Sequence, residues 1–281
     1  NDIFVVIACG LLLFSALNIF DDGFGLLAFT GLSWLVAEFF VLKRRMALPA
    51  IALLLAFVGG AFALAVALLK PHVDDVYVIA SAIAIVAAYA HWRRFHVPLT
   101  VAAGSAAGIG FLVASVLAVF PGIDAWLMPI IFSCGLTIFI FAMYWDASDR
   151  QRVTRRSDVA FWLHLLSAPL IIHPVFTSLG ILSGEQSLLS MVVVLVLYLL
   201  MTLISVAVDR RAFMVSSLVY VIYALTNLFN TYGLVGYSLA FTGMVIGSGL
   251  LLLSAYWHHA RSVLFKLLPA IIQRYIPELT K

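Results

Sequence analysis

Charged residues and cysteines are scarce in this chain. Of its 281 residues, 10% are charged and two are cysteine, while 64% are hydrophobic. Soluble domains are usually about half apolar and about a quarter charged, so a water-soluble fold would leave much of this apolar surface exposed. Cys9 and Cys134 lie in apolar runs without a CxxC spacing or a nearby histidine. We interpret both as small hydrophobic residues within a membrane, not as metal ligands.

The basic residues give no sign of a nucleic-acid partner. The formal net charge is only +3, and the basic residues form short clusters between apolar runs instead of one continuous face. Proteins that bind nucleic acid present such a face. The clusters therefore bear on membrane topology, and nucleic acid is not an expected partner.

Apolar runs of membrane-spanning length follow one another along the chain. A helix needs roughly 20 apolar residues to cross about 30 Å of hydrocarbon. The runs predict an all-α, polytopic transmembrane bundle of about ten helices. The expected spans are residues 3–20, 24–42, 47–69, 75–92, 97–119, 125–145, 159–182, 187–208, 212–231 and 234–254.

Basic and acidic residues alternate between the connections of these spans. The basic clusters are Lys43, Arg44 and Arg45; Arg93 and Arg94; Arg150, Arg152, Arg155 and Arg156; Arg210 and Arg211; and Arg261, Lys266, Arg274 and Lys281. The opposite connections carry Asp21, Asp22, Asp74, Asp75, Asp124 and Glu185, with Lys70 as the basic exception. Cytoplasmic loops are enriched in Lys and Arg. The alternation therefore predicts that both termini and the arginine-rich turns are cytoplasmic.

The residues after the tenth span have a different pattern. Between Tyr256 and Pro277, apolar residues separate at helical spacing from polar ones such as His259 and Lys266. This predicts an amphipathic helix on the cytoplasmic leaflet, bent at Pro269. The expected organisation is a transmembrane helical domain over residues 1–254 and a cytoplasmic interfacial helix and tail over 255–281.

The expected cytoplasmic turns share a short pattern, in which an arginine pair precedes an aliphatic residue and then a proline or another apolar residue. The instances are Arg44 and Arg45 before Leu48 and Pro49, Arg93 and Arg94 before Val97 and Pro98, Arg155 and Arg156 before Val159 and Ala160, and Arg210 and Arg211 before Met214 and Val215. The spacing suggests a repeating helical hairpin. The alternative is that any protein with arginine-rich cytoplasmic turns has this appearance.

A few polar residues are expected at membrane depth, where such residues are costly and often functional. They are Asn18, Glu38, His164, His173, Asn227 and Asn230. A rise of about 1.5 Å per residue puts Glu38 and His164 in one layer near the cytoplasmic face, and Asn18, His173 and Asn227 in another toward the opposite leaflet. We predict Glu38, His164, His173, Asn18 and Asn227 as ligand-binding residues.

The seventh span, FWLHLLSAPLIIHP, is interrupted by two histidines and two prolines. Broken helices line many transport sites. His164 and His173 are expected on opposite faces, so one straight helix does not present both to the same ion. The alternative is that each histidine bonds to a neighbouring helix while the prolines bend the span. Glu38 is equally expected to meet an arginine, and the asparagines to form interhelical hydrogen bonds.

Motifs for catalysis are absent from the sequence, including HExxH, GxSxG, the Walker loop and a Gly-rich dinucleotide fingerprint. His91, His96, His258 and His259 flank the expected cytoplasmic interface beside arginines, where amphipathic rings are common. We therefore predict no metal and no cofactor, and catalysis is the least expected class of function.

The opening NDIFVVIACGLLLF and the segment FWLHLLSAPLIIHPVF resemble stretches of uncharacterised multi-pass membrane proteins of proteobacteria. The resemblance implies a location in the bacterial inner membrane and a cytoplasmic segment before Asn1, and it brings no assigned activity or site residues. In size, helix count and orientation the chain is also similar to the drug/metabolite transporter superfamily, whose five-helix halves have inverted topology. That similarity concerns architecture alone.

Three functions are compatible with these features, each with membrane lipids as partners. A carrier of a small solute or lipid would place His164, His173, Glu38 or Asn227 around a cavity. A noncatalytic scaffold, sensor or subunit of a larger complex would bind a protein partner on its cytoplasmic face. An intramembrane enzyme acting on lipid would use a histidine as general base and Glu38 as orienting acid, although the opposed faces of the histidines weaken this alternative.

Overall fold

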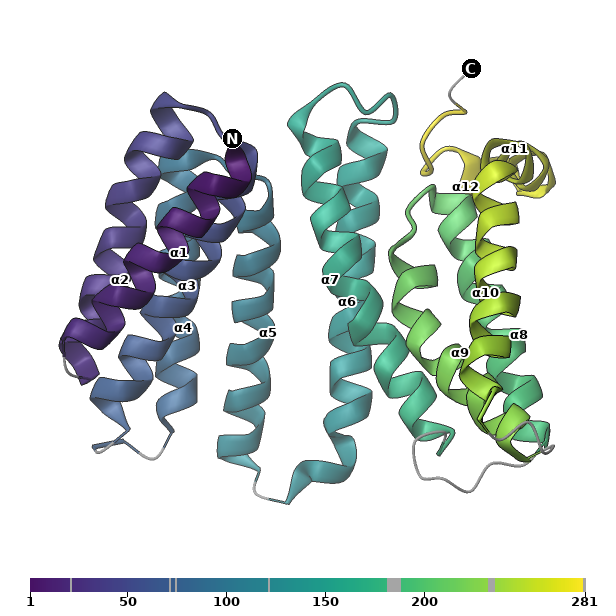
Figure 1. Cartoon of the computed structure of the whole chain (residues 1–281), viewed down its shortest axis with the longest axis horizontal. Coiled ribbons are helices and arrows are strands. Elements are labelled where there is room, and N and C mark those ends of the chain that lie inside the picture. The colour runs from purple at the N-terminus through teal and green to yellow at the C-terminus, as the bar shows by residue number, and fades with distance from the viewer. Residues whose placement is uncertain are drawn as a thin grey trace. The chain divides into compact units, whose positions relative to one another are not determined.

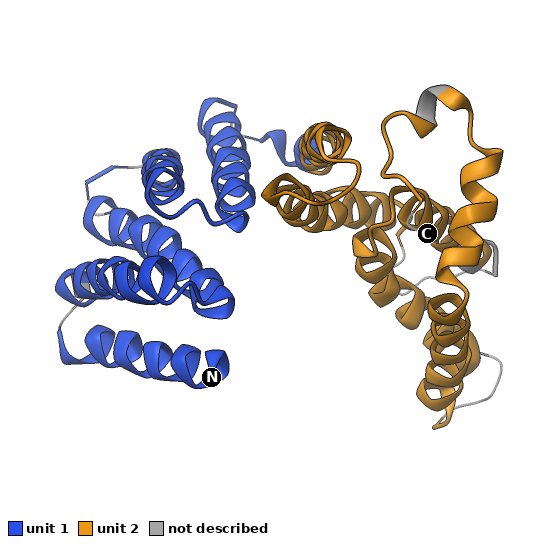
Figure 2. Cartoon of the chain, turned by 90° about the horizontal axis from the view of Figure 1, so that it is seen from above, with its two compact units in different colours: residues 1–127 blue, residues 128–281 orange. Residues whose placement is uncertain are grey.

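Every regular element that the structure describes is a helix. The computed structural model covers residues 1–20, 22–70, 72–73, 75–120, 122–180, 188–231 and 236–279 in describable detail. The chain forms two compact units, Asn1–Leu127 (unit 1) and Met128–Lys281 (unit 2), which Figure 2 colours separately. The prediction of an all-α helical bundle is confirmed.

Unit 1 contains five long helices. They are α1 (Asp2–Ile19), α2 (Asp22–Ala37), α3 (Ala47–Leu69), α4 (Val76–Phe95) and α5 (Leu99–Val119). A π-helix, η1 (Glu38–Lys43), continues α2, and a short 3₁₀ helix, η2 (Ile123–Trp126), follows α5. Helices that are consecutive in the sequence pack against each other, and α1 and α5 also contact α3.

Unit 2 contains the remaining long helices and the C-terminal segment. Its elements are α6 (Leu127–Ser148), α7 (Arg155–Ser178), α8 (Leu188–Val208), α9 (Ala212–Thr231), α10 (Ser238–Ala255), α11 (Trp257–Leu267) and α12 (Ala270–Gln273), all labelled in Figure 1. Helix α9 contacts α7, α8 and α10, while α11 contacts α8 and α10. The bounds of α1–α10 lie within a few residues of the expected spans.

The helices have the length and composition of membrane spans. In the described ranges, nine are long and apolar enough to cross a membrane, and the apolar stretch Val192–Val208 of α8 is a shorter candidate. Large apolar side chains such as Phe4, Ile140 and Val219 are exposed on the helix surfaces, as expected for side chains that face lipid. The chain is a multi-pass membrane protein.

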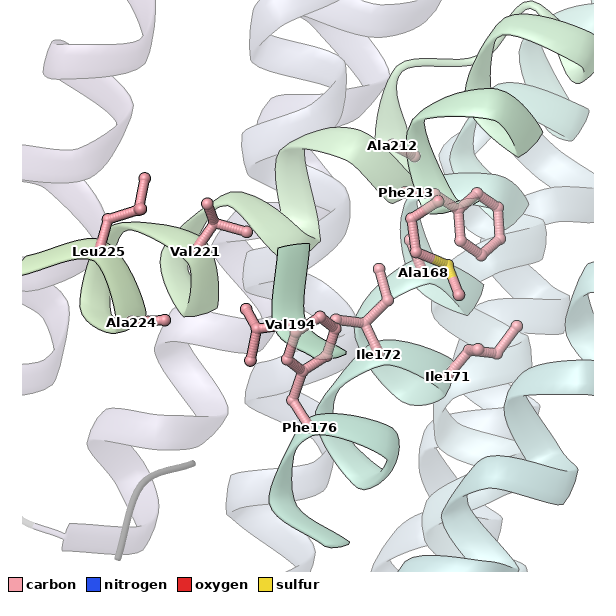
Figure 3. Packing of buried hydrophobic residues seen from close by; sticks show 11 residues of the cluster. Ala168, Ile171, Ile172, Phe176, Val194, Ala212, Phe213, Val221, Ala224 and Leu225 are labelled. Carbon is pink, nitrogen blue, oxygen red and sulfur yellow. The ribbon is translucent and has the colours of Figure 1, made fainter. Parts of the chain in front are cut away.

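The apolar core of unit 2 lies between α7, α8 and α9 (Figure 3). Ile172 and Phe176 are one helical turn apart on α7 and fully buried. They meet Val194 of α8 and Val221 of α9 in the same cluster. Residues four apart lie on one face of a helix, so this apolar stripe fixes the face that α7 turns toward its neighbours.

Four turns contain a left-handed residue that is not glycine. In the described ranges these are Arg45 (φ 53°), His96 (φ 52°), Arg152 (φ 57°) and Asp209 (φ 57°). One lies in each turn that joins α2 to α3, α4 to α5, α6 to α7 and α8 to α9. This conformation costs roughly 1–2 kcal/mol for such residues. Many helices end in a left-handed residue, so this recurrence fits both the repeating hairpin and the alternative that arginine-rich cytoplasmic turns look alike in any such protein. We call the helix ends at these turns the arginine-rich end of each unit.

The seventh span is continuous, which corrects the expectation of a broken helix. Helix α7 runs from Arg155 to Ser178 with Pro169 and Pro174 inside it. A proline removes the hydrogen bond to the carbonyl four residues earlier, which for Pro174 is that of Leu170. Gly135 of α6 lies against the backbone there, since a Cβ at Gly135 would be 2.9 Å from the Leu170 carbonyl carbon. The α7 segment that contains the prolines therefore lies close to α6.

Candidate functional site

The most unusual contacts of unit 2 surround Asp146, in the last turn of α6. Its Oδ2 lies 2.9 Å from His164 Nε2, and its Oδ1 accepts a 2.7 Å hydrogen bond from Arg210 Nη2. Arg210 also donates to the Ser157 carbonyl oxygen at 2.9 Å. One carboxylate thus connects α6, α7 and the turn between α8 and α9.

This group of charges is removed from solvent. The side chains of Asp146 and His164 are 0% exposed, and that of Arg210 is 10% exposed. Phe139 and Phe213 pack beside the imidazole, with ring centroids 5.5 and 6.5 Å away. Buried charges are tolerated only when they are paired and hydrogen-bonded. Asp146 satisfies this condition through both of its oxygens.

A second carboxylate, that of Asp209, lies beside Arg210 in the turn between α8 and α9. Its Oδ2 is 2.6 Å from Arg152 Nη1 and 3.7 Å from Arg261 Nη1, and its Oδ1 accepts a 2.7 Å hydrogen bond from Trp257 Nε1. Arg152 also donates to the Val208 and Asp209 carbonyl oxygens at 3.2 Å. The left-handed conformation of Asp209 directs the chain so that its side chain meets both the α6–α7 turn and α11.

Arg261 and a further arginine, Arg150, hold the C-terminal segment. Arg261 donates to the carbonyl oxygens of Pro277 at 2.7 Å and Glu278 at 3.1 Å. Arg150 donates to the carbonyl oxygens of Gln273 and Ile276, both at 3.2 Å. The α6–α7 turn, the α8–α9 turn, α11 and the tail therefore form one connected polar network, and Figure 1 shows them at the same end of unit 2.

The cations of this network remain charged despite their surroundings. Burial lowers the pKa of Arg261, and the nearby Asp209 carboxylate acts against this shift. Burial is also the main cause of the lowered pKa of Arg152, with repulsion from Arg210 adding to it. A guanidinium stays protonated in proteins. The lowered pKa values therefore report a desolvation cost that Asp209 and, for Arg152, also Asp146 offset in part.

The residues predicted as ligand-binding have separate partners in unit 2. His164 bonds to Asp146, as described above. His173 is exposed and its Nδ1 lies 2.6 Å from the Tyr220 hydroxyl. Asn227 is half-buried on α9. The two histidines of α7 thus face different surroundings, as their spacing predicted.

The predicted residues of unit 1 also have partners of their own. Glu38 accepts two hydrogen bonds from Arg94, at 2.8 Å from Nε and 2.6 Å from Nη2. This is the alternative in which Glu38 meets an arginine, and it occupies the carboxylate that was expected to share a layer with His164. Asn18 donates to the Phe14 carbonyl oxygen of its own helix at 2.7 Å.

His91 differs from its sequence interpretation as an interfacial ring. It is 0% exposed, with Nδ1 3.3 Å from the Thr100 hydroxyl. The rings of Trp34, Phe57 and Phe95 surround it, with centroids 4.5 to 6.1 Å away. Helices α2, α3 and α4 enclose this position, so the ring packs inside unit 1. Within the described residues, no three His, Cys, Asp or Glu side chains gather to hold a metal.

Unit 1 also contains an apolar groove of about 550 Å³ along α4 and α5. Small residues of α5, among them Ala107, Gly110 and Ala114, leave this space, and Asp75, Tyr77 and Ser81 of the α4 side add polar groups. None of the residues predicted as ligand-binding lines it.

The sequence interpretation did not identify Asp146, Asp209 or Arg261 as members of a site. Asp146 was expected just outside the sixth span, and Arg261 served only as a marker of topology. A usable signal was present, since Asp146, Asp149, Asp158 and Asp209 are acids at helix ends that otherwise carry arginines. An acidic residue at a helix end where the positive-inside rule predicts Lys or Arg is a candidate for a structural ion pair.

Comparison with protein families, curated proteins and solved structures finds no match for this chain. A proposal for its function therefore rests on the contacts described above.

Proposed function

We propose that this chain is a noncatalytic sensor or scaffold of the bacterial inner membrane, with its arginine-rich ends and C-terminal segment in the cytoplasm. The distribution of basic residues between the helices supports this orientation. The separate partners of Glu38, His164 and His173 give little support to a common solute site.

The Asp209 contacts carry this proposal. Through Arg152, Trp257 and Arg261, this carboxylate joins the ends of α6–α9 to the segment that follows α10. A protein that binds the exposed side of this segment would act on the helix ends through the same network. In this proposal, the cytoplasmic face of unit 2 passes conformational changes of the membrane helices to the protein partner.

Site-specific photo-crosslinking in cells tests the proposal. A photoreactive residue replaces the exposed Tyr275 of the tail, and a control replaces the exposed Tyr89 on α4. We expect one adduct of defined mass from position 275 and a different pattern from position 89. Asp209→Asn should weaken the adduct, because the segment loses its anchor. If position 275 gives no adduct in any growth condition, the scaffold proposal is wrong.

A carrier of a small solute or lipid is the second candidate, and the groove of unit 1 favours it. A large side chain in Ala114→Phe would fill this groove. If a solute raises the thermal stability of the purified protein and Ala114→Phe abolishes that rise, the carrier replaces the scaffold as the leading function.

A further inference from the structure

Helix α11 crosses the axis of α10 at the arginine-rich end of unit 2. Figure 1 shows α11 nearly end-on beside α10, and Figure 2 shows it from the side. The chain bends at Tyr256, between Ala255 and Trp257. A helix that crosses a membrane-spanning helix at its end lies along the membrane surface.

One face of α11 is fixed to the protein. Trp257 and Arg261 are 5% and 2% exposed, and both contact Asp209. They are four residues apart and therefore share a face. Because Asp209 holds both, the rotation of α11 about its axis is set by the protein.

A second face of α11 is apolar and exposed. Val263 is 47% and Leu267 is 76% exposed, and they are also four residues apart. Just before the bend, Leu251 and Leu252 of α10 are exposed as well. Exposed apolar side chains therefore occur on both sides of the bend, and α10 is a candidate membrane span.

Apart from Tyr256 and Tyr275, the exposed polar side chains of this region are basic. They are His258, His259, Lys266, Arg274 and Arg211, the last of which lies 4.9 Å above the Trp257 ring. No Asp or Glu occurs between Tyr256 and Pro277. Asp209 already contacts Arg152 and Arg261, and Glu278 lies 3.5 Å from Arg150. The exposed surface therefore has positive charge without nearby compensation.

We propose that α11 binds the headgroup layer of an anionic phospholipid leaflet. Val263 and Leu267 insert among the upper acyl chains, while Lys266 and Arg274 lie at the phosphates. Trp257 and Arg261, held by Asp209, orient the helix so that these faces meet the lipid. Amphipathic helices with basic residues bind anionic membranes in this way. The inference does not depend on the existence of a protein partner.

Nitroxide accessibility in nanodiscs tests the proposal. In a Cys9→Ala, Cys134→Ala background of the full chain, one label is placed at Leu267→Cys and a control label at His258→Cys, on another exposed face. The discs contain phosphatidylcholine alone or with phosphatidylglycerol. We expect the label at 267 to favour oxygen and the label at 258 to favour a nickel complex. Phosphatidylglycerol should increase the contrast about twofold.

Two sets of variants separate charge from anchoring. Lys266→Gln with Arg274→Gln should remove the effect of phosphatidylglycerol, whereas Lys43→Gln in unit 1 should leave it unchanged. Trp257→Phe and Asp209→Asn should each reduce the contrast between positions 258 and 267, because α11 then rotates.

Three outcomes would overturn the inference. A label at 267 that favours nickel in both lipids places α11 in water. A label at 267 shielded from both reagents shows that protein covers this face. Equal accessibility in both lipid mixtures removes the role of the anionic headgroup.

Discussion

In the part of the chain that the structure describes, units 1 and 2 have the same number of long helices but differ in how deeply their charged side chains are buried. At the arginine-rich end of unit 1, the pair Glu38–Arg94 is largely exposed, with side-chain exposures of 32% and 53%. In unit 2, Asp146 and His164 are fully buried together with Arg210. Unit 1 instead encloses His91 among aromatic rings.

The exposed pair of unit 1 and the buried pairs of unit 2 should contribute differently to stability. An exposed ion pair contributes little, because water screens it and the side chains lose freedom. A buried pair is strongly destabilising when one partner is removed, because the other charge remains without compensation. Unit 1 should therefore tolerate loss of its pair, whereas unit 2 should depend on each member of its network.

The largest expected effect comes from Asp146→Asn in unit 2. Arg210 would remain buried without its counter-charge, so we expect the free energy of unfolding to fall by about 3–5 kcal/mol. Steric-trapping measurements in bicelles provide this value. Glu38→Gln is the matched control in unit 1 and should change stability far less. Similar losses in both variants would show that burial does not distinguish the two units.

Replacing one histidine in each unit sharpens the comparison. His164→Phe removes a hydrogen bond to a buried carboxylate, and we expect a loss of about 2–3 kcal/mol. His91→Phe removes only a neutral contact with Thr100 and keeps the ring packing, so a loss of about 1 kcal/mol or less is expected. Unfolding in the same bicelles measures both, and a larger loss for His91→Phe would contradict the assignment.

Replacing a glycine at a helix contact with alanine should have a smaller effect on stability. A Cβ at Gly135 would lie 2.9 Å from the backbone of Leu170, whereas at Gly60 the nearest atoms belong to the side chains of Thr30 and Phe29. Overpacking against backbone costs about 1–3 kcal/mol, so Gly135→Ala should destabilise more than Gly60→Ala. Gly247→Ala, with nothing within 4 Å among the described residues, is the control and should be neutral in a thermal shift assay.

The smallest expected effect is a pH dependence confined to the α6–α7 turn. Burial raises the pKa of Asp149, but hydrogen bonds from Thr154 and Val153 outweigh it and hold this pKa below its ordinary value. A carboxyl group with a lowered folded-state pKa stabilises the protein at neutral pH and loses that contribution as pH falls through the folded-state value.

The difference in unfolding free energy between wild type and Asp149→Asn should therefore shrink in acid. A difference that stays constant across this range would exclude the contribution of Asp149. The α4–α5 turn of unit 1 has no equivalent acid.

The helices themselves could be predicted well from the sequence. Apolar runs of about 20 residues define membrane spans whatever their neighbours are, and α3 begins and ends at the predicted residues 47 and 69. Helix α7 continues through Pro169 and Pro174, so these prolines do not break the seventh span. Glycines within the helices differ in their surroundings, which local sequence does not reveal: a Cβ at Gly60 or Gly104 would meet neighbours, while one at Gly108, Gly243 or Gly247 would meet nothing within 4 Å in the described chain.

The candidate site could be predicted only in part. His164 was identified because a histidine at membrane depth is costly. Its depth could be predicted because it depends only on the position of His164 within its own helix. Its partners, Asp146 and Arg210, are 18 and 46 positions away in the sequence. The sequence by itself determined where the helices run, because hydrophobic length is a local property. Only the tertiary structure decided which charges share a buried site, because pairing depends on the rotation and contact of helices that local sequence does not specify.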